Sequence, residues 1–259
     1  ELRARRESTA VCIWSGCGLY GGCMKPYYEH AGITIYLGDC LDVMPQLGEA
    51  CAGVVYTDPP FTAAGGSTNG GVLDADTQFF EHWFDEVAER MRRCSSPASC
   101  WLMHCDWRTI GAIQRSAQRA GRNIRSEAFR VTQALYWHRG SIGMGQPFRN
   151  AVEMLAFAPG PRWASQMPKD ISTLIEEPWP YGYKQHHGAE KPVPLIERLL
   201  KLVDPWPGLR VLDPFAGSGS TLVAAKNLGR LAIGIEREER YCEIAAKRLS
   251  QEVLFGVQP

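Results

Sequence analysis

Two short segments place an acidic residue directly after an apolar run, where it could bind or activate a ligand. In the first, VVYTDPPF, the β-branched run from Val54 predicts a buried strand that ends before Pro59 and Pro60, because proline lacks a backbone N–H donor. Asp58 is therefore expected at the carboxyl end of a strand, where open α/β sheets bind their ligands. A plain Asp-Pro turn at a strand exit accounts for this segment equally well.

The second segment, VLDPFAGSGST, runs from a predicted strand into a glycine loop and then into a helix. Gly217 and Gly219 let the backbone approach a ligand closely, and the helix that follows offers free N–H groups at its positive end. The next predicted strand ends in Glu236, near the position from which an acid commonly bonds a ribose hydroxyl. This order of elements predicts a site for a nucleoside cofactor.

Two residues of this loop favour S-adenosylmethionine over a dinucleotide. The dinucleotide fingerprint requires a third small residue, and position 222 is Leu. Asp213 lies immediately before the loop, where its charge would repel a pyrophosphate. The same charge suits S-adenosylmethionine, which carries a sulfonium and an ammonium group and no phosphate. The sequence therefore predicts S-adenosylmethionine as the cofactor.

Strands that alternate with helices are predicted on either side of both segments. The strands are expected as short apolar runs at residues 33–37, 53–57, 98–104, 128–137, 151–158, 209–213 and 231–235. The helices are expected at residues 40–47, 77–94, 107–120, 193–203, 220–228 and 239–249. A glycine-rich polar segment at 62–76 is expected to be a mobile surface loop. This alternation predicts a doubly wound, mostly parallel α/β sheet.

Composition limits the class of protein. Of the 259 residues, 45% are apolar and 22% are charged, which is ordinary for a soluble globular protein, and no apolar run is long enough to cross a membrane. The nine cysteines lack paired spacing and mostly lie in apolar patterns, which favours reduced thiols in a cytoplasmic protein. Cys12, Cys17 and Cys23 lack the spacing of a zinc knuckle, so no metal site is predicted.

Positive charge is concentrated in one part of a chain whose formal net charge is zero. Residues 108–169 contain ten Lys and Arg residues against two acids, a local net charge of +8, with aromatic and amide residues interleaved. Such a stretch is typical of proteins that bind a phosphate backbone. Taken singly, Arg115, Arg119 and Arg122 are explained by a solvated helix face, but that explains the whole region less well, because solvated faces usually mix both signs of charge.

Together, the two acid-bearing segments resemble the amino-methylating DNA methyltransferases. Their order, DPPF before FAGSG, is similar to the circularly permuted β group of that family. Three further segments fit the same pattern, namely GDCL at 38–41, WHRG at 137–140 and KPV at 191–193. The resemblance extends over residues 32–249. It departs from the family at Ala189, where a hydroxyl residue is usual, and at Arg139, which replaces the common lysine.

The resemblance implies a Rossmann-like, S-adenosylmethionine-dependent methyltransferase fold. The methyltransferase domain would span residues 24–249, with a target-recognition insert at 138–190, an N-terminal appendage at 1–23 and a tail at 250–259. The residues that match the family's catalytic motif are Asp58, Pro59, Pro60 and Phe61. The residues that match its cofactor-binding motifs are Asp39, Cys40, Lys191, Asp213, Phe215, Ala216, Gly217, Ser218, Gly219, Ser220 and Glu236.

Such a site has to activate the exocyclic amino group of a base, whose lone pair is conjugated into the ring. The carboxylate of Asp58 and the carbonyl of Pro59 can accept both amino hydrogens and direct the lone pair at the methyl group. The carboxylate also stabilises the positive charge that develops on the nitrogen, and Phe61 can stack on a base flipped out of the duplex. None of the cysteines follows a proline, which argues against a cytosine C5 methylase.

We therefore predict a site-specific enzyme that methylates N6 of adenine in double-stranded DNA and acts in the cytoplasm of a prokaryote or as a phage-encoded protein. Asp before Pro-Pro favours adenine, because the family's cytosine-N4 members more often carry Ser there. Cytosine N4 methylation on the same scaffold is the main alternative. A DNA-binding protein without catalysis, and an enzyme acting on RNA or a protein amide, are further alternatives. Several relatives dimerise, so a homodimer is also an open expectation.

Overall fold

The computed structural model describes residues 24–60, 74–120, 129–142, 147–163, 170–179, 190–203 and 209–251, with side chains from residue 78 onward in the second range. The strands are β1 (Tyr28–His30), β2 (Ile33–Leu37), β3 (Ala52–Thr57), β4 (Ser95–Cys105), β5 (Gln133–His138), β6 (Val152–Pro159), β7 (Leu174–Glu176), β8 (Val211–Asp213) and β9 (Ala232–Glu236). The helices are α1 (Cys40–Val43), α2 (Asp74–Cys94), α3 (Ile110–Ala120), α4 (Val193–Val203), α5 (Ser220–Asn227) and α6 (Glu239–Ser250), with a 3₁₀ turn at Met44–Gln46.

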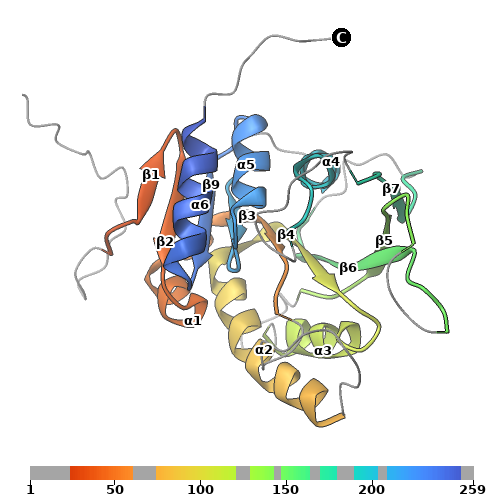
Figure 1. Cartoon of the computed structure of the whole chain (residues 1–259). Coiled ribbons are helices and arrows are strands. Elements are labelled where there is room, and N and C mark those ends of the chain that lie inside the picture. Colours follow the sequence, from red (N-terminus) through yellow and green to blue (C-terminus); the bar gives the residue numbers. More distant parts are fainter. Residues whose placement is uncertain are drawn as a thin grey trace, which may run out of the picture.

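All nine of these strands join one sheet, in the order β1-β2-β9-β8-β3-β4-β6-β5-β7 (Figure 1). Its centre, from β2 to β4, is parallel, and β5 and β7 also pair in parallel. The antiparallel pairs are β1–β2, β4–β6 and β6–β5. The predicted mostly parallel α/β sheet is therefore confirmed.

Helices cover both faces of the sheet, and each face has its own apolar core. Helices α4, α5 and α6 pack on one face, and α1, α2 and α3 pack on the other. Strand β3 is buried along its whole length and contributes to both cores: Val54 and Tyr56 belong to the first, and Val55 to the second. Burial on both faces explains why β3 reads as a continuous apolar run.

Every strand and helix expected from the sequence is present, with bounds that differ by a few residues. The glycine-rich segment expected as a loop at 62–76 lies almost wholly outside the described residues, but helix α2 already begins at Asp74, earlier than predicted. Strands β1 and β7 were not predicted, because three residues are too few to display a hydrophobic period.

The predictions about the cysteines and the N-terminal appendage concern residues that lie partly outside the described ranges. The cysteines within those ranges are free thiols: Cys40, Cys51, Cys94, Cys100, Cys105 and Cys242. Cys12, Cys17 and Cys23, and the whole proposed appendage at 1–23, lie outside them. Among the described residues, no helix combines the length and the apolar character that a membrane span requires.

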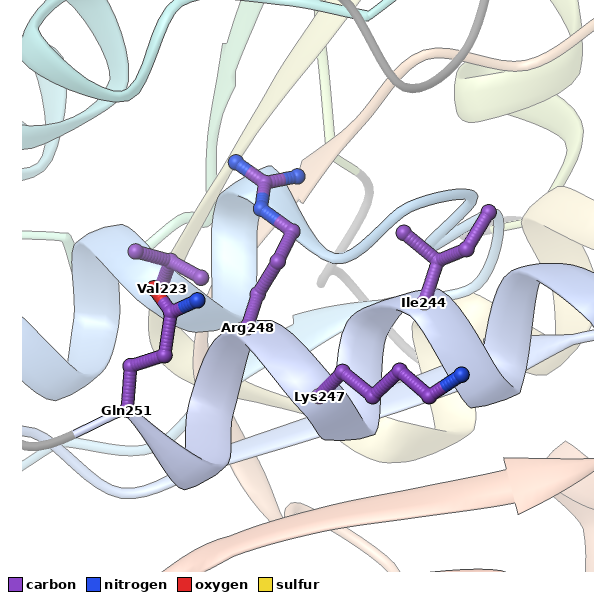
Figure 2. Close-up of a pocket in the computed structure, with 5 residues that line it drawn as sticks. All are labelled: Val223, Ile244, Lys247, Arg248 and Gln251. Carbon is purple, nitrogen blue, oxygen red and sulfur yellow. The ribbon is translucent and has the colours of Figure 1, made fainter.

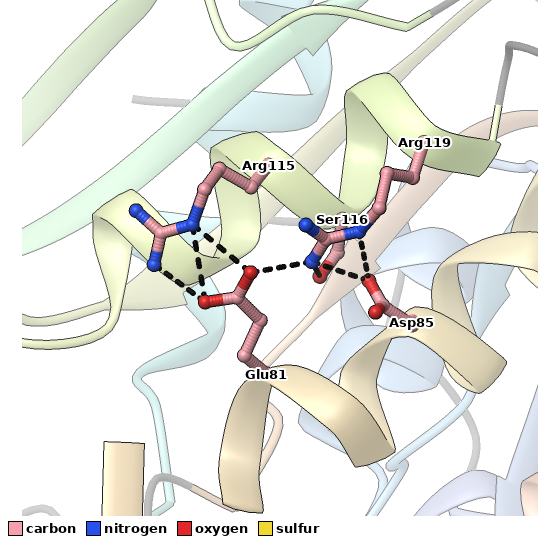
Figure 3. A network of polar contacts seen from close by, with 5 residues as sticks. All are labelled: Glu81, Asp85, Arg115, Ser116 and Arg119. Carbon is pink, nitrogen blue, oxygen red and sulfur yellow. Dashed lines mark hydrogen bonds and ion pairs between the residues drawn. The ribbon is translucent and has the colours of Figure 1, made fainter. Parts of the chain in front are cut away.

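The basic stretch is less available to a partner than its charge count indicates. Arg115 and Arg119 on α3 point at α2, where they pair with Glu81 and Asp85 (Figure 3). The Arg119 Nη2 to Asp85 Oδ1 distance is 2.8 Å, and the Arg115 Nε to Glu81 Oε1 distance is 2.9 Å. These two acids precede the counted stretch, so a local count cannot include them. The side chains of Arg115 and Arg119 are 55% and 38% exposed, which agrees with the interpretation as a solvated helix face, but their ion pairs offset part of the positive charge there. Arg122 lies outside the described residues.

Acid should weaken this contact between α2 and α3. Hydrogen bonds from Arg115, reinforced by Arg119, hold the pKa of Glu81 at about 2 against the partial burial that would raise it. An acid with a lowered pKa stabilises the fold fully above its unfolded pKa, near 4.5, and loses that contribution as the pH falls towards 2. We expect Glu81→Gln to lower the free energy of unfolding by about 1 kcal/mol at pH 7, since solvent screens the pair.

Urea unfolding of the wild type and the Glu81→Gln variant at pH 7 and pH 3.5 measures this difference. It should shrink at the lower pH. The matched control is Glu86→Gln on the same helix, because Glu86 pairs only one turn away with Arg90 at an exposed position. A difference between wild type and Glu81→Gln that stays constant with pH would contradict the assignment.

Candidate active site

The two acid-bearing motifs meet where the order of the strands reverses. Strands β3 and β8 are parallel neighbours, with Val54 opposite Val211 and Val55 opposite Leu212. The chain leaves β8 through α5 towards β9, and it leaves β3 through α2 towards β4, on the opposite face and in the opposite direction. Such a switch point opens a crevice at the carboxyl ends of the strands, where ligands bind. Asp58 and the glycine loop both lie at this edge.

Asp213 ties the two motifs together. Its carboxylate is buried and accepts a hydrogen bond from the Thr57 hydroxyl at 2.9 Å and from the Phe215 backbone N–H at 3.1 Å. Burial raises its pKa to about 6, although these bonds and one from Thr221 oppose the rise. The structure thus shows Asp213 joining the ends of β3 and β8. Its contact with a cofactor stays a prediction.

The glycine loop has a backbone that only glycine adopts easily. Gly217 has a φ of +52° and Gly219, the N-cap of α5, has a φ of +84°. A Cβ at Gly219 would lie 2.7 Å from the Cβ of Ala245, so this glycine is also needed for packing against α6. A Cβ at Gly217 would meet nothing within 4 Å. The loop therefore faces open space at Gly217 and packed protein at Gly219.

Glu236, the acid predicted to follow the loop, lies beside it. Its Oε2 accepts the N–H of Gly217 at 2.9 Å, and its Oε1 accepts the N–H of Glu238 at 2.7 Å. Both bonds fix the carboxylate at the carboxyl end of β9. The structure therefore brings the loop and the acid together, while the predicted bond to a ribose stays a prediction.

Asp39 and Cys40 lie at the same edge, after β2. The last residue of β2, Leu37, pairs with Glu236, and Gly38 donates its N–H to the Glu236 carbonyl at 2.9 Å. Asp39 caps α1 by accepting the N–H of Leu41 at 2.8 Å. Cys40 is buried, and this burial raises the pKa of its thiol to about 12, so it stays uncharged at neutral pH. Three neighbouring strand ends thus carry predicted cofactor residues.

The remaining residues predicted to bind the cofactor form the loop itself and the start of α5. Phe215 packs its ring against Trp83 of α2, with the ring centroids 5.6 Å apart. The other members are buried in the loop or in the first turn of the helix: Ala216, Ser218 and Ser220.

Glu190 and Arg248 support the loop, and the sequence had not pointed to either. Arg248 on α6 donates to the Ser218 carbonyl at 2.8 Å and forms an ion pair with Glu190 at 3.1 Å. The Ser220 hydroxyl donates to the same Glu190 oxygen at 3.2 Å. Glu190 has a side chain only 1% exposed. Nothing in the sequence around Arg248 distinguishes it from an ordinary basic residue in the last turn of a helix.

Arg248 also lines a hollow of about 360 Å³ between α5 and α6, together with Val223, Ile244, Lys247 and Gln251. In Figure 2 its side chain extends from α6 towards α5, while that of Lys247 leaves the helix in another direction. Lys247 pairs with Glu243 on its own helix and is largely exposed. Arg248 and Lys247 can therefore be compared directly, because Arg248 holds the glycine loop and its neighbour Lys247 faces solvent.

Around Asp58, four charged side chains form a chain. Lys191 Nζ lies 3.0 Å from Asp58 Oδ2 and 3.2 Å from Glu153 Oε2, and Arg139 Nη1 lies 3.0 Å from Glu153 Oε1. The structure thus places Lys191, predicted at the cofactor, directly against the predicted catalytic acid; a cofactor contact stays a prediction. Glu153 was missed, because nothing in its own segment marks it.

Of the other residues predicted to be catalytic, Pro59 is buried and Pro60 is exposed, while Phe61 lies outside the described residues. A buried pair joins the strand that leads to Asp58 to its neighbour: the Tyr56 hydroxyl on β3 and His104 Nε2 on β4 are 2.7 Å apart. Burial, and secondarily the charge of Lys191, holds the pKa of His104 well below its usual value. This histidine is therefore neutral and adds no second positive charge near Asp58.

A doubly wound sheet with a glycine loop, a following acid and a second acid at the switch point has the architecture of a Rossmann-like methyltransferase. More specifically, the chain belongs to the DNA methylase family: the N6/N4 methyltransferase family model, described as DNA methylase, matches residues 53–247. The predicted resemblance to amino-methylating DNA methyltransferases is thereby confirmed.

Individual relatives and solved structures agree with this family. The type II methyltransferase M2.LlaDCHI of Lactococcus lactis subsp. cremoris is 26% identical over 268 residues, which cover 92% of this chain and 97% of the relative. The M1.HpyAVI–SAM complex has a TM-score of 0.61 at 24% identity and covers 84% of this chain and 100% of that one. The cytosine-N4-specific PvuII DNA methyltransferase has a TM-score of 0.66 at 19% identity, covering 88% and 89%. Both structures share the fold.

Weakening the support behind the glycine loop should weaken cofactor binding. We expect Arg248→Lys, which keeps a positive charge beside the buried Glu190, to loosen the loop and reduce the affinity for S-adenosylmethionine about tenfold, or roughly 1.4 kcal/mol. Isothermal titration calorimetry measures this change. Lys247→Ala, one residue away on α6, serves as the control and should bind as the wild type does. Equal affinities for the two variants would count against a supporting role of Arg248.

Proposed function

We propose that this DNA methyltransferase transfers a methyl group from S-adenosylmethionine to N6 of adenine in double-stranded DNA. The observation that supports this most directly is the hydrogen bond from Thr57 to Asp213, since it joins the strand end that carries Asp58 to the one that carries the glycine loop. A base held by Asp58 and a cofactor held by the loop would therefore be neighbours.

The residues at the edge fit S-adenosylmethionine. The open space above Gly217 leaves room for a ligand against the backbone, and Glu236 stands beside it as an acceptor for ribose hydroxyls. When bound, S-adenosylmethionine supplies an electrophilic methyl group. The protein's own part is to hold the loop in place, through Asp213 on one side and Arg248 on the other.

On the other side of the site, Asp58 accepts one amino hydrogen of the flipped base, and the Pro59 carbonyl accepts the other. The two bonds draw the nitrogen towards tetrahedral geometry and aim its lone pair at the methyl group. Asp58 then faces the positive charge that develops on the nitrogen, in a pocket where its side chain is only 20% exposed. The reaction needs no metal and no covalent intermediate with the protein.

Cytosine N4 is the second candidate, because the cytosine-N4-specific PvuII enzyme shares this fold. Both targets are exocyclic amino groups, so the same two acceptors serve either. Asp rather than Ser before Pro-Pro favours adenine. The discriminating experiment is nucleoside analysis of DNA from a host that lacks its own methylases and expresses the chain. We expect N6-methyladenine. N4-methylcytosine would support the second candidate, and the absence of both methylated nucleosides would refute the proposal.

We propose that the predicted insert at 138–190 contacts the DNA. Strand β6 within this range belongs to the sheet, so the contacts would come from the segments before and after it. Arg149 and Arg162 are exposed there, as are the apolar side chains of Ile142 and Phe148. The boundaries of the appendage, domain and tail stay predictions.

We also propose that the enzyme acts in the cytoplasm, where its DNA substrate is accessible. A homodimer is a further expectation, which a measurement of molecular mass in solution would test.

A further inference from the structure

The ammonium group of Lys191 forms an ion pair with Asp58, the acid proposed to accept an amino hydrogen of the base. It lies 3.0 Å from Asp58 Oδ2, within hydrogen-bond distance, and its side chain is 13% exposed. An amino group of a base would have to share Asp58 with this cation. A positive charge at that position would also oppose the positive charge that develops on the base nitrogen. Lys191 on Asp58 Oδ2 therefore weakens this carboxylate as an acceptor for the base.

Glu153 offers Lys191 a second partner. Its Oε2 lies 3.2 Å from Lys191 Nζ, so the lysine can leave Asp58 with only a small movement of its terminal atoms. The other oxygen of Glu153 is bound by Arg139 at 3.0 Å, which fixes the carboxylate in place on β6. Both acids help to keep the pKa of Lys191 raised, although burial by itself would lower it. Lys191 is thus a permanent cation that needs an anionic partner at all times.

We propose that Glu153 is a positioning residue that holds Lys191 away from Asp58 when the target base enters, so that Asp58 becomes free to accept the amino hydrogen. This inference rests on the proposed role of Asp58 but concerns different atoms. Glu153 acts through Lys191 and touches neither the base nor the cofactor. Without its charge, Lys191 remains on Asp58 and competes with the base.

A pair of variants tests this directly. Glu153→Gln removes the charge at nearly constant shape, and we expect the kcat on saturating DNA to fall about 30-fold, with the affinity for S-adenosylmethionine unchanged. In the double variant Glu153→Gln/Lys191→Met no lysine remains to block Asp58. With S-adenosylmethionine also saturating, so that a contact of Lys191 with the cofactor does not limit the rate, its kcat should recover at least tenfold over that of Glu153→Gln. Two mutations that only damaged the structure would instead add their losses.

The matched control is Glu197→Gln on α4, because Glu197 is half-buried like Glu153 and its carboxylate accepts a hydrogen bond from Asn227 at the last residue of α5, outside the proposed insert. It should keep the wild-type kcat. Thermal unfolding of each variant checks that the fold is retained. A double variant no more active than Glu153→Gln would overturn the inference, as would a Glu153→Gln variant as active as the wild type.

The failure of this inference can be separated from failure of the proposed function. If the wild type methylates adenine or cytosine amino groups and Asp58→Ala does not, the function holds whatever the Glu153 variants show. If the wild type yields neither product, the function itself has failed.

Discussion

The Asp58→Ala variant is expected to lose methyl transfer by roughly a thousandfold or more, while its affinity for S-adenosylmethionine stays within about threefold of the wild type. In the proposed mechanism Asp58 supplies both an acceptor for the amino hydrogen and the charge that stabilises the forming cation, so its removal should affect the transition state more than any bound ground state. The cofactor loop is held by Asp213 and Arg248, neither of which is altered by this change.

Single-turnover methylation with labelled S-adenosylmethionine measures the rate, and calorimetry measures the affinity. Asp106→Asn is the matched control, because Asp106 follows the neighbouring strand β4 and pairs with Arg108 rather than with Lys191. It should remain within a few-fold of the wild-type rate. Substantial turnover by Asp58→Ala would remove Asp58 from the catalytic role.

Gly217→Asp should abolish detectable binding of S-adenosylmethionine, a loss of at least about a hundredfold, or roughly 2.7 kcal/mol. The new side chain would project into the open space above the loop, which is the space assigned to the ligand. It would also place a second carboxylate close to Glu236, which already accepts the Gly217 N–H. Methyl transfer should disappear together with binding.

Gly229→Asp provides an unusually close control for this variant. Gly229 has a φ of +66°, close to the +52° of Gly217, and a Cβ there would likewise meet nothing within 4 Å. Both substitutions therefore carry the same kind of backbone strain, about 1–2 kcal/mol, but Gly229 follows α5 at the end remote from the loop. We expect similar losses of thermal stability and a loss of binding only at Gly217. Unchanged affinity in Gly217→Asp would contradict the pocket assignment.

The sequence predicted those parts of the molecule that depend on neighbouring residues. Helix α4 has the predicted bounds, since its apolar residues recur at a helical period, and β2 does as well. Asp58 and Glu236 were found because each follows an apolar run directly. In these cases the local pattern already contains the physical cause of the structure.

Pairings between distant residues could not be predicted in this way. Lys191 and Glu153 meet because β6 inserts between β4 and β5, which no pattern in either segment indicates. Glu190 and Arg248 meet for a similar reason, at the junction of α5 and α6. For Arg119 the same limitation hid a pairing, since its partner Asp85 lies on another helix and offsets its charge at the surface.

The hydrogen bond between Thr57 and Asp213 has a consequence for the way the enzyme is made. The two residues lie far apart in the chain, so β3 finds its neighbour β8 only after most of the polypeptide has been synthesised. A nascent chain that already contains Asp58 still lacks the strand that completes its pocket. Such late, non-local pairing slows folding, and an incomplete translation product, however well its first half folds, has no competent site with which to modify the DNA of its host.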